Sequence, residues 1–223
     1  MTWKQFFTSS IGKKYTMAFT GLFLVFYLII HAGINAAIFL NDNGETFNTY
    51  AHFMSHNWLV RILEIGLFAG FIIHIIQGLM LWFQNRAARP VRYAVNKQEK
   101  SSTWYSRSMG LLGTLLLLFL IMHLSHFWLG SKVALYGKGD APHNLYEEMK
   151  VIFTNPLWLV AYLIGLVALF WHLLHGFQSA WQTIGVNSKK IRPILRTAGI
   201  IYSIAITLLF ALMPISVFFG WIK

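Results

Sequence analysis

Four histidines lie one each inside four separate apolar segments of the chain: His31, His74, His123 and His172. Imidazole is costly to bury in hydrocarbon without a partner, so four such residues in one small chain call for a shared explanation. Histidine nitrogens are axial ligands of haem iron, and two haems with two histidines each would use all four side chains. The residues therefore predict two bis-histidine haem sites.

The elements that carry these histidines are membrane spans. Hydrophobic residues make up 57% of the 223 positions and charged residues only 11%, which leaves too little polar surface for a soluble domain. Five charge-free runs reach the roughly 20 residues that a helix needs to cross hydrocarbon. We expect an all-α integral membrane protein, a single domain over residues 1–223, in which helices two to five form a bundle around two b haems with helix one against them. The expected helices are 15–40, 58–84, 105–131, 156–183 and 196–222.

The charges between the spans predict the orientation. Loops on one side carry 13 basic residues and one acidic residue, and loops on the other side carry five basic and six acidic residues. Basic loops stay in the cytoplasm. The N-terminus is therefore expected inside and the C-terminus outside, in a multi-pass protein of the bacterial inner membrane.

Other readings of the composition are less favoured. The net charge of +11 could suit a nucleic acid, but the basic residues sit in short loops beside spans, where topology and anionic membrane lipids account for them. We expect no nucleic-acid partner. The chain has no cysteine, so it holds neither a thiolate-bound iron–sulfur cluster nor a thioether-attached haem.

Helix direction sorts the four histidines into two layers. A helix rises about 1.5 Å per residue, so position along a span gives depth. His31 and His123 fall in the outer half of the membrane, and His74 and His172 fall in the inner half. The main competing reading is a proton relay without haem, which would favour carboxylates inside the membrane, and the only acid near a span is Glu64.

Two of the predicted ligands have a histidine neighbour that could replace them. His126 follows His123 by three residues and His175 follows His172 by three, so each pair shares nearly one helical face. Periodicity does not decide between them. We favour His123 and His172 because they lie deeper, and assign His126 and His175 to the haem surroundings, next to the propionates, or to the membrane interface.

Each inner-layer histidine has a glycine four residues later on the same face: Gly78 after His74 and Gly176 after His172. A glycine lets a flat macrocycle approach the backbone, although close packing between helices would use glycine equally.

Outside the layers, His52 and His56 lie four residues apart but lack a third ligand for a metal ion. An amphipathic segment over the outer surface is the simpler reading for them. Arg61 and Glu64 would form an ion pair at the outer end of helix two, and their functional reading is a proton-accepting quinone site.

Taken together, these features resemble a known family. They are the five spans, the histidines on helices one to four, the segment Phe47-Asn-Thr-Tyr-Ala-His-Phe-Met54 and the two His-x-x-x-Gly elements. The chain is similar over almost its whole length to the dihaem cytochrome b membrane subunit of bacterial succinate dehydrogenase and fumarate reductase.

The resemblance implies His31 with His123 as ligands of the distal haem, and His74 with His172 as ligands of the proximal haem. It also implies a flavoprotein subunit with FAD and an iron–sulfur subunit on the cytoplasmic face, and a dimer of complexes is compatible with it. Some members place a glutamate two residues before the helix-four ligand to carry protons. Phe170 stands there, so that proton path is not expected.

The predicted function is that of an electron-transferring anchor for a succinate:quinone oxidoreductase, using menaquinone, with succinate chemistry on the partner subunits. Two alternatives stay open: a dihaem anchor of another dehydrogenase, such as a hydrogenase or formate dehydrogenase, and a haem-free proton-conducting or transport protein.

Overall fold

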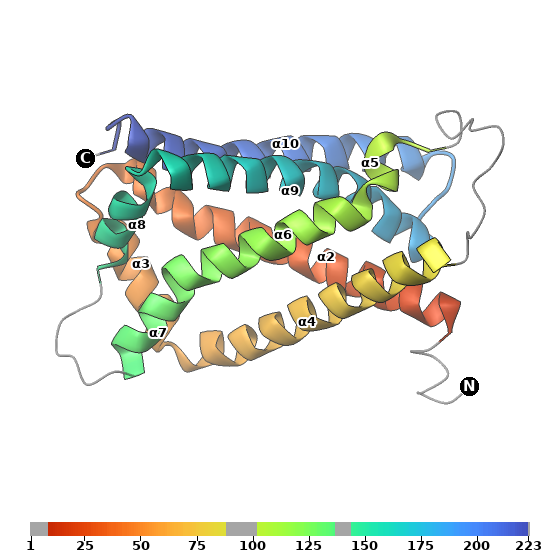
Figure 1. Cartoon of the computed structure of the whole chain (residues 1–223), viewed down its shortest axis with the longest axis horizontal. Coiled ribbons are helices and arrows are strands. Elements are labelled where there is room, and N and C mark those ends of the chain that lie inside the picture. The colour runs from red at the N-terminus through yellow and green to blue at the C-terminus, as the bar shows by residue number, and fades with distance from the viewer. Residues whose placement is uncertain (1–8, 88–101, 137–143, 223) are drawn as a thin grey trace.

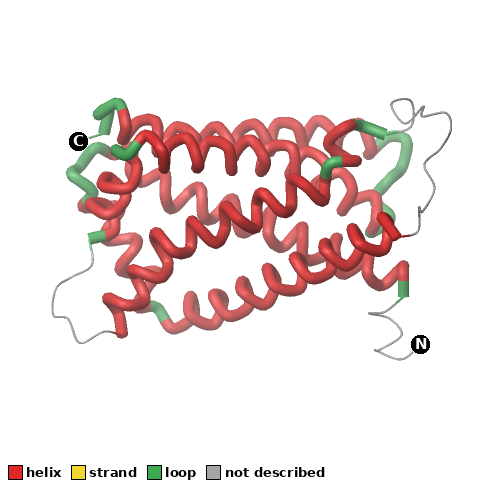
Figure 2. The backbone as a smooth tube through the Cα atoms, in the orientation of Figure 1, coloured by secondary structure: helices red, strands yellow, loops and turns green. Residues whose placement is uncertain are grey.

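The computed structural model describes residues 9–87, 102–136 and 144–222. These residues form helices joined by short connections, and they contain no strand (Figure 2). Five helical runs are long and apolar enough to cross a membrane, which confirms the predicted all-α membrane fold. The spans are α2 (Ser10–Asn35) with the 3-10 turn η1 (Ala36–Leu40), α4 (Trp58–Ala87), α6 (Met109–His123) continued by η3 (Leu124–Trp128) and α7 (Leu129–Tyr136), α9 (Pro156–Thr183) and α10 (Ile191–Phe218).

The helix starts follow ordinary capping. Ser9 accepts a hydrogen bond from the Gly12 amide at the start of α2, and Asn155 caps α9 ahead of Pro156 in its first turn. α9 begins at the predicted residue, whereas α2 and α10 begin earlier than residues 15 and 196. A charge-free run marks the part of a helix that crosses hydrocarbon, and the helix itself continues into the charged residues beyond it.

The third span is interrupted by a π-helical segment. Residues Leu124–Trp128 form η3, directly after His123. Single π turns inside α-helices are rare and occur frequently at functional sites. The short α5 (Trp104–Arg107) precedes this span.

The spans run side by side along the long axis of the molecule (Figure 1). α9 and α10 pack closely against each other, and α6 packs against α9. α2 contacts both α4 and α9, so the first span lies between other spans. We expected helix one to pack against the bundle of helices two to five, and its contacts with α4 and α9 agree with this.

The two ends of the bundle differ. The end at which α4 stops and α10 starts, here called the basic end, carries Arg86, Arg107, Lys189, Lys190, Arg192 and Arg196. The opposite end, here called the far end, carries α3 (Glu45–His56) and α8 (Leu145–Phe153) (Figure 1).

The best-packed region lies at the far end, where Phe47 of α3 and Tyr146 and Phe153 of α8 are buried against Tyr162 and neighbouring residues. Hydrogen bonds from Thr46 in the first turn of α3 hold the pKa of Asp42 below its ordinary value. In contrast, α4 contains no buried residue, so this span is held by a few specific contacts.

Candidate functional site

His31 and His123 face each other from α2 and the end of α6. Their ring centroids are 5.7 Å apart, with the rings nearly perpendicular at 87°. The His31 ring stacks on Tyr27, whose hydroxyl lies 3.5 Å from His31 Nδ1. The Asn35 amide nitrogen lies 3.3 Å from the same atom. A free lone pair on Nε2 requires a proton on Nδ1, whose hydrogen bond the Tyr27 hydroxyl can accept, whereas the Asn35 nitrogen can only donate.

His74 and His172 face each other from α4 and α9, with ring centroids 6.2 Å apart at an angle of 68°. Thr20 of α2 holds His74, because its Oγ1 lies 3.0 Å from His74 Nδ1. The same hydroxyl donates to the Thr16 carbonyl at 2.7 Å. A hydroxyl has one proton, so Thr20 accepts from an Nδ1–H of His74. That tautomer leaves the lone pair of His74 on Nε2.

The hydrogen bond between Thr20 and His74 fits ligation through Nε2 of His74. Among the residues that the structure describes, no hydrogen bond reaches Nε2 of His31, His74, His123 or His172. Nδ1 of His123 and of His172 is also buried without a partner there. A buried polar atom left unpaired costs about 1–3 kcal/mol. Iron ligation through Nε2 would use four nitrogens that hydrogen bonding leaves unused, and it would not change the unpaired state of Nδ1 in His123 and His172.

The spacing of the rings fits as well. Two imidazoles bonded to opposite sides of one ion at about 2 Å, a usual metal–imidazole bond length, have ring centroids about 6 Å apart. The observed separations of 5.7 and 6.2 Å are close to this value. No group of three or more metal-ligating side chains occurs within the described residues, as suits sites in which a porphyrin would supply the other nitrogens.

The two predicted glycines leave room beside the inner pair. A Cβ added at Gly176 would meet nothing within 4 Å, and one added at Gly78 would meet only the flexible end of Met17 at 3.7 Å. By contrast, a Cβ at Gly110 would overlap Trp82 of α4, which makes Gly110 a helix-packing glycine. The open flank of Gly176 is compatible with a flat group beside the inner pair, and Gly33, Gly66 and Gly113 on other spans are equally open.

The alternative ligands lie elsewhere. His126, inside η3, stacks on Tyr162 and has its Nδ1 3.1 Å from the Tyr162 hydroxyl. His175 contacts the Tyr105 ring. The rings that face His31 and His74 belong to His123 and His172, the pair that depth favours.

Glu64 forms the centre of a polar cluster toward the far end. The predicted contact with Arg61 is present at 3.4 Å. Two further partners come from the third span: Lys132 Nζ lies 2.7 Å from Oε2, and Trp128 Nε1 donates to Oε1 at 2.6 Å. Sequence reasoning missed both. Their spacing of four residues, which places them on one helical face, was the available signal.

The remaining predicted residues lie apart from the pairs. His52 and His56 stack on the exposed side of α3 with centroids 3.9 Å apart, and His56 Nδ1 contacts the His52 carbonyl. Phe170 packs against the ring of its neighbour Trp171, and the sequence of α9 contains no carboxylate.

Comparison with known proteins gives one match. Residues 83–212, more than half of the chain, match the sequence model of the family described as succinate dehydrogenase/fumarate reductase transmembrane subunit. No curated protein and no solved structure gives a significant match. The matched region includes His123, His126, His172 and His175, and it confirms the resemblance found in the sequence. The chain therefore belongs to the succinate dehydrogenase/fumarate reductase transmembrane subunit family, and is a multi-pass membrane anchor of a complex with flavoprotein and iron–sulfur subunits.

Proposed function

We propose that this subunit passes electrons between the iron–sulfur partner and membrane quinone through two b haems. The observation that carries the proposal is the pairing of four histidines, from four spans and at two depths, with every Nε2 free of hydrogen bonds among the described residues. Haem, when bound, supplies one-electron transfer. Succinate chemistry belongs to the flavoprotein partner with its FAD.

The residues of this chain would hold and orient the two groups. His31 and His123 would hold the distal haem, and His74 and His172 would hold the proximal haem. Thr20 fixes the tautomer and ring angle of His74, as carboxylates and carbonyls do for other metal-bound histidines. Gly78 and Gly176 leave space beside the proximal pair, and His126 and His175 are neighbours of the haem edges.

The basic end would face the cytoplasm. Positive loops stay inside, and the same charge suits docking of the iron–sulfur subunit. In this orientation the N-terminus would be inside and the C-terminus outside, and we propose that the chain is a single domain of the bacterial cytoplasmic membrane. The proximal pair then lies on the partner's side and the distal pair toward the far end.

We propose that Glu64 accepts a proton from quinol when quinol is oxidised, or donates one when quinone is reduced. Menaquinone is the proposed substrate. Lys132, Arg61 and Trp128 surround the Glu64 carboxylate. The two cationic neighbours and the Trp128 donor favour the ionised carboxylate, so Glu64 would take a proton from quinol only transiently and release it again. Glu64 lies toward the far end of the bundle, as do His31 and His123 of the distal pair.

Replacing Glu64 with glutamine is expected to lower succinate:menaquinone activity by at least about 100-fold, the usual loss when an acid–base group is removed. Transfer from succinate to an artificial acceptor should stay unchanged, because the partner subunits perform it. Glu147→Gln is the matched control, since Glu147 pairs with Lys150 on the exposed face of α8. Full quinone activity in Glu64→Gln would exclude this role.

Replacing Thr20 with valine keeps the shape of the side chain and removes the acceptor for His74 Nδ1–H. Loss of such a partner typically costs 10–100-fold in affinity for the bound group, so the proximal haem should be depleted. Thr20→Ser should retain it. The measurement is haem content and the low-temperature spectrum of the purified complex. Unchanged content and spectrum in Thr20→Val would show that the hydroxyl does not position His74.

A reduced-minus-oxidised spectrum with a haem count on the purified complex tests the whole proposal. Two b haems per chain are expected. Absence of haem would instead support the proton-conducting or transport alternative. Family membership favours a succinate or fumarate complex over a hydrogenase or formate dehydrogenase anchor, and the flavin and iron–sulfur subunits that co-purify would test that choice.

A further inference from the structure

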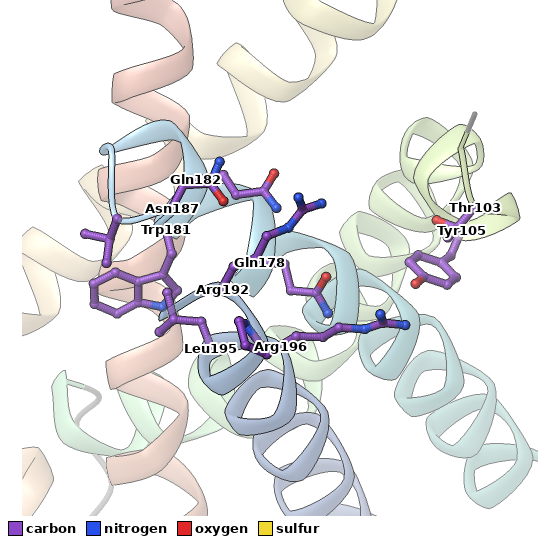
Figure 3. Close-up of a pocket in the computed structure, with 11 residues that line it drawn as sticks. Thr103, Tyr105, Gln178, Trp181, Gln182, Asn187, Arg192, Leu195 and Arg196 are labelled. Atoms are coloured by element: carbon purple, nitrogen blue, oxygen red, sulfur yellow. The ribbon is translucent and has the colours of Figure 1, made fainter. Parts of the chain in front are cut away.

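A pocket of about 380 Å³ lies at the basic end, between the end of α9, the start of α10 and the α5 segment. Gln178 and Gln182 lie four residues apart on α9, and Arg192 and Arg196 lie four residues apart on α10. Each pair therefore shares a helical face. Figure 3 shows these side chains together with Trp181 and Tyr105 around the same hollow.

The pocket is rich in hydrogen-bond donors. Its lining contains two guanidinium groups and no carboxylate. Within the described residues, neither Arg192 nor Arg196 forms an ion pair. Trp181 Nε1 is buried and has no hydrogen-bond partner there. Two unpaired cations and an unused indole donor around one hollow suit an anion with several oxygens, because guanidinium groups bind phosphate in a bidentate manner.

The pocket continues into an apolar groove on α10. This groove is shallow and wide open, with a volume of about 480 Å³, and its lining residues all lie on α10: Pro193, Ile194, Thr197, Ala198 and Ile201. Pro193 lines both hollows. At about 1.5 Å per residue the groove follows α10 for about 12 Å away from the basic end. Ile194 and Ile201 are 66% and 62% exposed, so the groove opens on the outer surface of the bundle.

We propose that this composite hollow binds one anionic phospholipid, with the headgroup phosphate at Arg192 and Arg196 and an acyl chain along the groove. The negative phosphate complements the two arginines of the pocket. The apolar acyl chain complements the apolar groove, which continues from the pocket along a membrane span. Free phosphate would leave the groove without a role. Basic pockets between spans at one membrane face are suited to anionic lipid headgroups.

The test uses the delipidated complex, with the full chain and its partner subunits, titrated with phosphatidylglycerol or phosphatidylcholine and measured by native mass spectrometry. Wild type should bind phosphatidylglycerol at least about tenfold more tightly than phosphatidylcholine. The double variant Arg192→Gln/Arg196→Gln should lose this preference. The matched control Lys189→Gln/Lys190→Gln removes the same charge from exposed positions beside the pocket and should keep it.

A second variant, Ala198→Phe, fills the groove and leaves both arginines intact, so it tests the site even if the double variant does not accumulate. It should weaken phosphatidylglycerol binding at least about tenfold. Ala198 is exposed, so the larger side chain need not disturb the helix packing.

Four results would overturn the proposal. Wild type could show no preference for the anionic lipid, or the lysine control could lose as much as the arginine variant, which would indicate general surface charge. Ala198→Phe could bind normally while inorganic phosphate displaces phosphatidylglycerol, which would indicate a simple anion site. Finally, the arginine variant alone could lose the iron–sulfur subunit and still bind lipid as wild type does, which would assign the pocket to that partner.

Discussion

Replacing His123 with alanine is expected to remove one of two haems, whereas replacing His126 with alanine should leave both. The His123 ring faces His31 at 5.7 Å, and the His126 ring lies against Tyr162. Removing an axial ligand breaks an iron–nitrogen bond that no neighbouring side chain is placed to restore. Haem stoichiometry of the purified complex is the measurement, and His31→Ala should give the same loss as His123→Ala.

The same comparison applies to the inner pair. His74→Ala and His172→Ala should each lose the proximal haem, while His175→Ala should not, because His175 contacts Tyr105 instead of His74. Retention of both haems in His123→Ala, with loss of one in His126→Ala, would reverse the ligand assignment on the third span. Loss of both haems from every variant would instead point to a collapse of the bundle.

Collapsing the membrane potential is expected to depress succinate:menaquinone activity in sealed vesicles or intact cells. Electrons that move from the basic end to a quinone site at the far end would travel toward the positive side of the membrane. Each charge that crosses the full field gains about 2.3 kcal/mol per 100 mV, so two electrons gain about twice that. Phe170 stands two residues before His172, where the family resemblance implies that some members have a glutamate for a compensating proton flow.

An uncoupler provides the measurement, and transfer from succinate to an artificial acceptor provides the control, because that reaction does not cross the membrane. The control should be unaffected. Equal quinone activity with and without a potential would contradict the prediction and would place the quinone on the cytoplasmic side or indicate electroneutral turnover.

The spans were predictable because charge is excluded from hydrocarbon, but the exact helix ends were not. Lys13 lies in the first turn of α2 and donates to the Gln84 side chain of α4 at 3.1 Å. A charged residue with a partner in space does not end a helix, and the partner is 71 residues away in the sequence. The short helix α8 was missed, although Tyr146, Met149 and Phe153, which it buries, have helical spacing.

The sequence was sufficient to predict which histidines of the candidate site face each other. Alternating helix direction places His31 with His123 and His74 with His172, and the ring separations agree with that pairing. What holds the rings was not predictable. Thr20 on α2 contacts His74 on α4, which lies 54 residues away in the sequence. The π segment after His123 contains no proline or glycine that would have signalled a break in the α-helix. Such features depend on how helices rotate against each other.

The contacts of α4 imply that its positions are not equally free to change over evolutionary time. No residue of this helix is fully buried, and its exposed apolar side chains would face lipid, where one aliphatic residue replaces another at little cost. Its positions with specific partners include Glu64, Gly70 against Phe23, His74, Trp82 against Gly110, and Gln84, which accepts from Lys13. Related sequences should therefore vary at most positions of α4 and keep the same residues at these few positions. Where one of these residues does change, its partner on α2 or the third span should change with it.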